Sequence, residues 1–177
     1  MELLRYRLRT AFFTLPDFSG WLVTFLLFLV FALLAYLILR KSKLFTFSLI
    51  RLRPSQIGLL IVIAVFTPSL PEELLYRVLL LPHPSEGATP NVYLTWSVTS
   101  LVLFILAHPL LAWGAWPWAR AIFYRPAFLL IVALLGVACT LAYYATGSLW
   151  APVAIHWATI VGWKLFFGGP DFNLGQR

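Results

Sequence analysis

The sequence predicts an all-α membrane protein, built as a polytopic bundle of about five to six transmembrane helices. Of its 177 residues, 62% are hydrophobic and only 11% are charged, whereas soluble domains are about 45–50% apolar and about 25% charged. Long apolar runs recur along the chain, separated by short basic or proline-rich segments. Aromatic residues make up 17% of the chain and include eight Trp, which suits aromatic belts at the two membrane interfaces.

The apolar runs divide the chain into an N-terminal segment, a bundle and a tail. Residues 1–19 are basic and aromatic, as in an interfacial helix. Residues 20–167 form the predicted bundle, with spans expected at 20–39, 57–81, within 92–116, within 126–145 and at 149–167. Pro68 and Pro71 interrupt the second stretch, which should therefore be kinked or split. Residues 168–177 are a polar tail.

The net charge of +7 indicates membrane orientation, with lipids rather than nucleic acid as the partner, because Lys and Arg lie in short loops. Loops 40–53 and 117–126 carry basic residues, whereas loop 82–91 carries none. Five spans would place the basic loops in the cytoplasm. Three arginines near the N-terminus, at positions 5, 7 and 9, contradict this orientation. An even number of spans, with the N-terminal segment re-entrant or crossing, would remove the conflict.

Five ionisable residues interrupt the apolar stretches: Glu72, Glu73 and Arg77 in the second, His108 in the third and His156 in the fifth. Each such group costs about 2.5–3.5 kcal/mol to insert and usually has a function. Glu73 and Arg77 are spaced i and i+4, the favourable order for a helical ion pair. Glu72 has no such local partner and is free to act as a general base.

One Glu and two His from three helices can position a water molecule, which needs no cofactor. The alternative is a divalent metal such as zinc held by Glu72, His108 and His156. A structural origin, with the histidines as packing residues and the Glu–Arg pair as a helix contact, also stays open. The third histidine, His83, lies between two prolines in a loop and is expected at the surface.

Three motifs occur in order on separate apolar stretches. EELLYR occupies 72–77, FILAH occupies 104–108, and GSLWAP precedes His156. This set resembles the CPBP (ABI) family, which contains CAAX prenyl-protein endopeptidases and bacteriocin-processing enzymes, with the pattern EExxxR, FxxxH and HxxxN or HxxxD. The resemblance covers about 57–167, the predicted catalytic core. It departs from the pattern at Ile160, where the family often has Asn or Asp.

The resemblance implies an intramembrane endopeptidase with its active site within the membrane. Glu72 would be the general base, His108 its partner, and His156 would stabilise the oxyanion. Glu73, Arg77 and Phe104 would support these residues. The substrate would be a membrane-associated protein or peptide, and the enzyme would be a multi-pass protein of a bacterial plasma membrane or a related internal membrane.

Two functions from other classes compete with this interpretation. Ile160 has no hydrogen-bond donor, which favours a catalytically impaired scaffold or chaperone that binds hydrophobic segments. An ion or proton transporter would use Glu72 and the histidines as a relay, but five short spans without visible repeats argue against it. The sequence does not identify the substrate, and no feature is specific to prenylated proteins.

Overall fold

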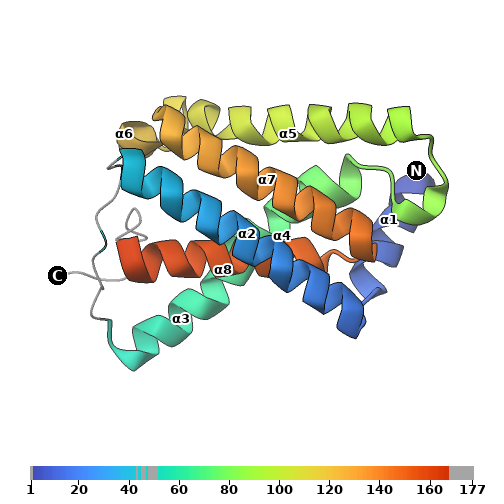
Figure 1. Cartoon of the computed structure of the whole chain (residues 1–177), viewed down its shortest axis with the longest axis horizontal. Helices are drawn as coiled ribbons and strands as arrows, with labels where there is room; N and C mark the ends of the chain where they lie inside the picture. Colours follow the sequence, from blue (N-terminus) through green and yellow to red (C-terminus); the bar gives the residue numbers. More distant parts are fainter. Residues whose placement is uncertain (1, 43, 45–46, 48–51, 168–177) are drawn as a thin grey trace.

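The chain folds into a helical bundle, as the sequence predicts (Figure 1). A computed structural model describes residues 2–42, 44, 47 and 52–167, and these residues form helices and no strand. The α-helices are α1 (Glu2–Phe13), α2 (Phe18–Ser42), α3 (Pro54–Ala64), α4 (Leu70–Glu73), α5 (Pro90–Trp113), α6 (Arg120–Phe123), α7 (Pro126–Thr146) and α8 (Trp150–Phe167).

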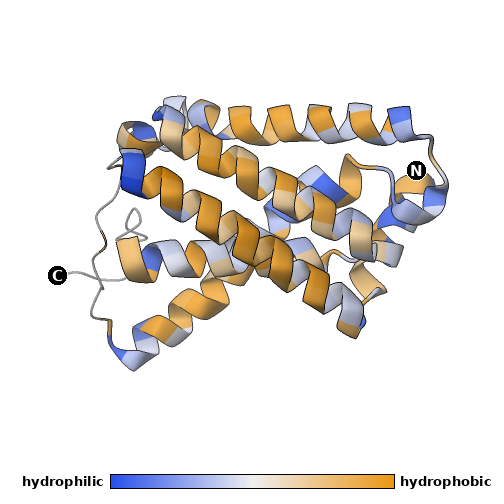
Figure 2. Cartoon of the chain, in the orientation of Figure 1, coloured by the Kyte–Doolittle hydropathy of each residue, from blue (hydrophilic) through white to orange (hydrophobic). Residues whose placement is uncertain are grey.

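Four segments within the described residues are long and apolar enough to cross a membrane: α2, the stretch Pro54–Glu86, α5 and α7. The colouring of Figure 2 shows how apolar these helices are along most of their length. A helix of 18 residues, α8, lies where the fifth span was expected, and its crossing of the membrane stays a prediction. It is not among the four candidates, because His156 and Lys164 lower its hydropathy. The protein is thus an integral membrane protein.

Helix α7 is the centre of the bundle. Half of the residues in its most apolar 18-residue segment are buried. The corresponding share in α5 is 11%, so most of the α5 surface is left for lipid. The buried residues of α7 include several small ones, which allow neighbouring helices to approach closely: Gly136, Ala138, Cys139 and Ala142. The core around α7 also contains Phe31 of α2, Phe104 of α5 and Ile155 of α8.

The second apolar stretch is split, as its prolines predict. Helix α3 ends at Ala64, a kinked segment occupies Val65–Ser69, and α4 spans only four residues before a π-helical turn at Leu74–Leu79. Thr67 has extended backbone angles (φ −154°, ψ 113°), and Pro68 follows it. Proline has no N–H to donate and its ring clashes with the preceding turn, so a regular helix cannot continue here. π-Helical turns within α-helices are frequent at functional sites.

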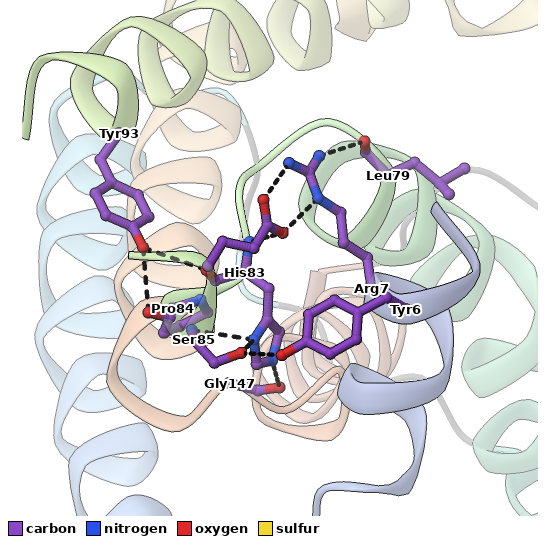
Figure 3. A network of polar contacts seen from close by, with 9 residues as sticks. Tyr6, Arg7, Leu79, His83, Pro84, Ser85, Tyr93 and Gly147 are labelled. Carbon is purple, nitrogen blue, oxygen red and sulfur yellow. Dashed lines mark hydrogen bonds and ion pairs between the residues drawn. The ribbon is translucent and has the colours of Figure 1, made fainter. Parts of the chain in front are cut away.

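A network of polar contacts fixes one end of the bundle (Figure 3). Arg7 of α1 donates two hydrogen bonds to the Glu86 carboxylate, at 2.6 and 2.7 Å. The Tyr6 hydroxyl lies 2.6 Å from that of Ser85. Helix α1 therefore does not cross the bundle but is held against the loop that leads to α5. Its location at the membrane interface stays a prediction.

The expectation that His83 is a surface residue is wrong, since the residue is only 4% exposed. Its Nε2–H donates to the carbonyl of Gly147 at 2.9 Å, and its Nδ1 accepts from the Ser85 backbone N–H at 3.2 Å. The ring of Tyr6 lies against one edge and that of Tyr143 against another. The flanking prolines correctly indicated a loop, but α1 covers that loop, and the sequence contains no signal of this.

The predicted basic loop at 40–53 lies partly outside the described residues, and the predicted tail at 168–177 lies wholly outside them.

Candidate active site

Helix α4 carries the two adjacent glutamates into the bundle, where their environments differ. The side chain of Glu73 is fully buried, whereas that of Glu72 is 21% exposed and lines a cavity. The break before α4 sets the direction of this short helix. Adjacent helical residues point about 100° apart, so one carboxylate faces the protein core and the other the cavity.

Glu73 and Arg77 form the predicted ion pair, with Arg77 Nε 3.1 Å from Glu73 Oε2. The alignment of this contact is that of an ion pair rather than of a linear hydrogen bond. Arg77 also donates from Nη2 to the carbonyl of Gly136 at 3.0 Å. Its guanidinium lies 4.7 Å from the centre of the Phe104 ring, a cation–π contact. Arg77 thus joins the second stretch to α5 and α7.

His156 bridges the two glutamates. Its Nδ1 donates to Glu73 Oε1 at 2.7 Å, so Nδ1 carries a proton. Its Nε2 points toward Glu72, 3.9 Å from Oε2, a separation too long for a hydrogen bond. Arg77, Glu73 and His156 therefore form a continuous buried chain of charged and polar groups that ends beside Glu72.

His108 approaches the cavity from α5. Its Nδ1–H donates to the carbonyl of Phe104 at 2.9 Å, which leaves Nε2 as the nitrogen with a lone pair. Phe123 and Phe128 lie against its ring, with centroid distances of 5.3 and 5.7 Å. The neutral ring is therefore held in one orientation by one hydrogen bond and an aromatic wall.

Phe104 is the common packing partner of the site. It is fully buried, and its ring contacts those of His108 and His156 at centroid distances of 5.3 and 6.1 Å. Arg77 lies over the same ring. The aromatic residue four positions before His108 thus sets the spacing between the two histidines and the ion pair.

The cavity has a volume of about 340 Å³ and lies between α2, α7, α8 and the segment after α5. Its wall is mainly aromatic and aliphatic. Glu72, His108 and His156 all line it, so the structure brings the three predicted catalytic side chains to one space. Their chemical roles stay predictions. An apolar chamber with a few convergent polar groups is the usual form of a binding site.

The three residues do not form a compact ligand set. Within the described residues, no group of three His, Cys, Asp or Glu side chains is placed to hold a metal ion. His156 already uses Nδ1 for Glu73, and His108 uses Nδ1 for the α5 backbone. Nε2 of each ring, the nitrogen that a metal would take, stays available, so a metal held by Glu72, His108 and His156 stays a prediction for the chelator test.

Gly136 is a site residue that the sequence analysis missed. Its carbonyl accepts the hydrogen bond from Arg77. A Cβ atom at this position would lie 2.6 Å from Leu101 Cδ1, 3.1 Å from Phe104 Cδ1 and 3.5 Å from Arg77 Nη2. Only glycine lets α7 approach the ion pair without displacing a neighbour. A glycine within an apolar helix was the available signal, because small residues mark close helix packing in membranes.

Comparisons with known proteins agree with the motifs. Residues 54–161 match a protein-family model described as type II CAAX prenyl endopeptidase Rce1-like. No curated protein and no solved structure gives a significant match. The matched region begins with α3 and ends within α8, so it contains all the site residues described above.

Proposed function

Because the chain belongs to the Rce1-like family of type II CAAX prenyl endopeptidases, we propose that it is an intramembrane endopeptidase that uses Glu72 and His108 to activate water. The observation that carries this proposal is the contrast between the two glutamates. Glu73 is engaged by Arg77 and His156. Glu72 faces the cavity, and its Oε2 has no hydrogen-bond partner among the described residues.

The proposed reaction uses each group according to the atom it presents. Glu72 accepts a proton from water while the water oxygen bonds to the scissile carbonyl carbon. His108 Nε2 accepts a hydrogen bond and orients that water. The carbon–nitrogen bond then breaks, and the proton held by Glu72 passes to the leaving amine. The acyl fragment leaves as the free acid.

His156 supports the oxyanion in this scheme. Its Nδ1 proton is committed to Glu73, so Nε2 must also be protonated to donate to the oxyanion. A fixed donor aimed at developing charge is worth most in a site that excludes water.

The proposed substrate is a membrane-associated protein or peptide, because the cavity lies within the bundle and its walls are apolar. We place the enzyme in a bacterial plasma membrane or a related internal membrane. The geometry contains nothing that requires a prenyl group on the substrate.

The test compares the wild type with Glu72→Gln in detergent, using a library of quenched fluorescent peptides with and without a chelator. The substitution keeps the side-chain shape but removes the base, so we expect cleavage to fall by about 10²–10⁴-fold. Glu2→Gln, at an exposed position in α1, is the matched control and should cleave normally.

The chelator separates the two chemical alternatives, because wild-type cleavage should survive it. Loss of wild-type cleavage in chelator, restored by zinc, would instead support a metal enzyme. Cleavage by Glu72→Gln at the wild-type rate would contradict the proposed role of Glu72. No cleavage by the wild type of any peptide in the library would count against the peptidase and favour a scaffold that binds hydrophobic segments.

A further inference from the structure

On the cavity wall formed by α8, the position where the family pattern often has Asn or Asp offers no hydrogen-bond donor. Ile160 lines the cavity with a purely apolar side chain. Its neighbour Thr159 also lines it, but the Thr159 hydroxyl donates to the carbonyl of Ile155 at 2.8 Å. Trp157 directs its indole N–H to the carbonyl of Ile61 at 2.9 Å. These two donors are committed to backbone, although peptide hydrolysis requires donors for the developing oxyanion.

Thr67 lines the same cavity from the break in the second stretch. Threonine hydroxyls in helices commonly bond the carbonyl four residues earlier, as those of Thr24, Thr146 and Thr159 do here. Thr67 cannot follow this pattern, because its backbone is extended rather than helical. Among the described residues, nothing hydrogen-bonds its hydroxyl, and the residue is exposed.

Thr67 also lies close in the chain to Glu72, the proposed base. Only the turn at Pro68–Ser69 and the first residues of α4 separate it from Glu72, which lines the same space. The interruption of the helix therefore has two effects: it directs Glu72 into the cavity and leaves a hydroxyl there. Irregular backbone at membrane depth is tolerated where it is buried in protein or lines a cavity.

We propose that Thr67 contacts the substrate in the reaction proposed above. Its hydroxyl donates a hydrogen bond to the scissile carbonyl oxygen, and this bond strengthens when the carbonyl becomes an oxyanion. The hydroxyl proton stays on Thr67 throughout, and the water proton still passes through Glu72 to the leaving amine. Thr67 thus supplies, from the second stretch, the donor that Ile160 lacks on α8. This inference rests on the proposed peptidase function.

The experiment measures kcat and KM of the full chain with a peptide that the wild type cleaves. Thr67→Val keeps the size and removes the donor, so we expect kcat to fall by about 10²-fold while KM changes by less than about twofold. Thr67→Ser should retain most of the activity. Thr24→Val, at a threonine of α2 that does not line the cavity and whose hydroxyl donates to the carbonyl of Gly20 at 2.7 Å, should leave kcat unchanged.

A rescue distinguishes a lost donor from a distorted cavity. Ile160→Asn in the Thr67→Val background introduces a donor on α8, and we expect it to raise the kcat of Thr67→Val by at least tenfold. If Thr67→Val does not fold, as judged by its melting temperature, Thr67→Ala provides the same measurement without branched side-chain volume.

Wild-type kcat in Thr67→Val, or equal losses in Thr67→Val and Thr67→Ser, would overturn the role of Thr67. Glu72→Gln tested in parallel separates this result from failure of the proposed function. If Glu72→Gln is inactive and Thr67→Val is fully active, only the inference about Thr67 fails. If Glu72→Gln is fully active, the proposed peptidase mechanism fails and the role of Thr67 with it.

Discussion

The Arg77 guanidinium has no access to water and few possible partners for its charge and N–H groups, since the residue is only 1% exposed. The Glu73 carboxylate, the Gly136 carbonyl and the Phe104 ring are its contacts. A buried pair contributes little net stability, because desolvation offsets the attraction, but removing one partner leaves an uncompensated charge. The Glu73–Arg77 pair is therefore best understood as a device that fixes the position of His156.

We predict that Arg77→Met destabilises the protein by about 3–5 kcal/mol, because it leaves the Glu73 carboxylate without its cation. In a chain of this size, 1 kcal/mol corresponds to about 2–4 °C in Tm, so Tm should fall by roughly 6–20 °C. The measurement is thermal unfolding in detergent. Arg5→Met, at an exposed position in α1, is the control and should change Tm little. An equal effect of the two substitutions would contradict the assignment of Arg77.

At the scale of elements, α1 acts as a clamp on the C-terminal end of the second stretch. Arg7 pairs with Glu86 and also donates to the carbonyl of Leu79 at 3.3 Å, where the π-helical turn ends. Further along, the carbonyl of Ala11 accepts from the backbone N–H of Leu149 at 2.9 Å. A short helix outside the bundle thus connects the segment that carries the glutamates to the turn before α8.

We predict that Arg7→Met loosens this clamp. A hydrogen bond to a charged group is worth about 1.5–3 kcal/mol, so amide hydrogen exchange in α1 and at His83, Ser85 and Glu86 should accelerate by about 10-fold or more. Glu86→Gln should have a similar effect, although its Oε1 can still accept the His83 N–H bond at 2.6 Å.

The double variant provides the control for this prediction. Because the two side chains act as one pair, Arg7→Met with Glu86→Gln should be little worse than either single substitution, with a coupling energy of about 0.5–3 kcal/mol. Strictly additive effects would show that the two residues stabilise α1 independently and would contradict the clamp.

The sequence predicted the elements well because apolar length and proline positions are local properties. The expected spans correspond to α2, the split second stretch, α5, α7 and α8. The ion pair of Glu73 and Arg77 was predictable for the same reason, since its partners are one helical turn apart. Contacts between distant segments were not predictable: Gly136 marks close helix packing but not its partner Arg77, and the burial of His83 leaves no local pattern.

The roles of individual side chains are harder to predict from the sequence than the helices are. Glu72 and Glu73 are adjacent and chemically identical, and the i,i+4 spacing suggested which of them pairs with Arg77. The exposure of a hydroxyl at Thr67 depends on its backbone angles, which the sequence limited only by placing Pro68 next to it. Backbone breaks can be located from prolines, but the side chains that they expose require the structure.

At the scale of the whole molecule, the two ends of the bundle differ in charge. The end formed by α1 and loop 82–91 carries three arginines in α1 and three carboxylates, Glu2, Asp17 and Glu86. The described residues of the other end carry only basic charges: Arg40, Lys41, Arg53, Arg120, Arg125 and Lys164. The conflict noted for the N-terminal arginines is thereby reduced, since Arg7 is paired and α1 does not cross the bundle.

The cavity lies toward the basic end. Its lining includes Leu39 near the end of α2, Trp116 after α5, and Phe167 at the end of α8. If the basic end faces the cytoplasm, as the positive-inside rule predicts, substrate reaches Glu72 from the cytoplasmic side.

Thiol labelling tests this orientation, because the native Cys139 is fully buried and should not react. Ser55→Cys probes the exposed start of α3 at the basic end, and Thr89→Cys probes the exposed loop before α5 at the other end. A membrane-impermeant maleimide should label Ser55→Cys only in inside-out vesicles and Thr89→Cys only in spheroplasts. Unmodified protein, the control, should stay unlabelled in both. Labelling of both variants from one side would contradict a crossing between these positions, and the reversed pattern would place the cavity mouth outside the cell.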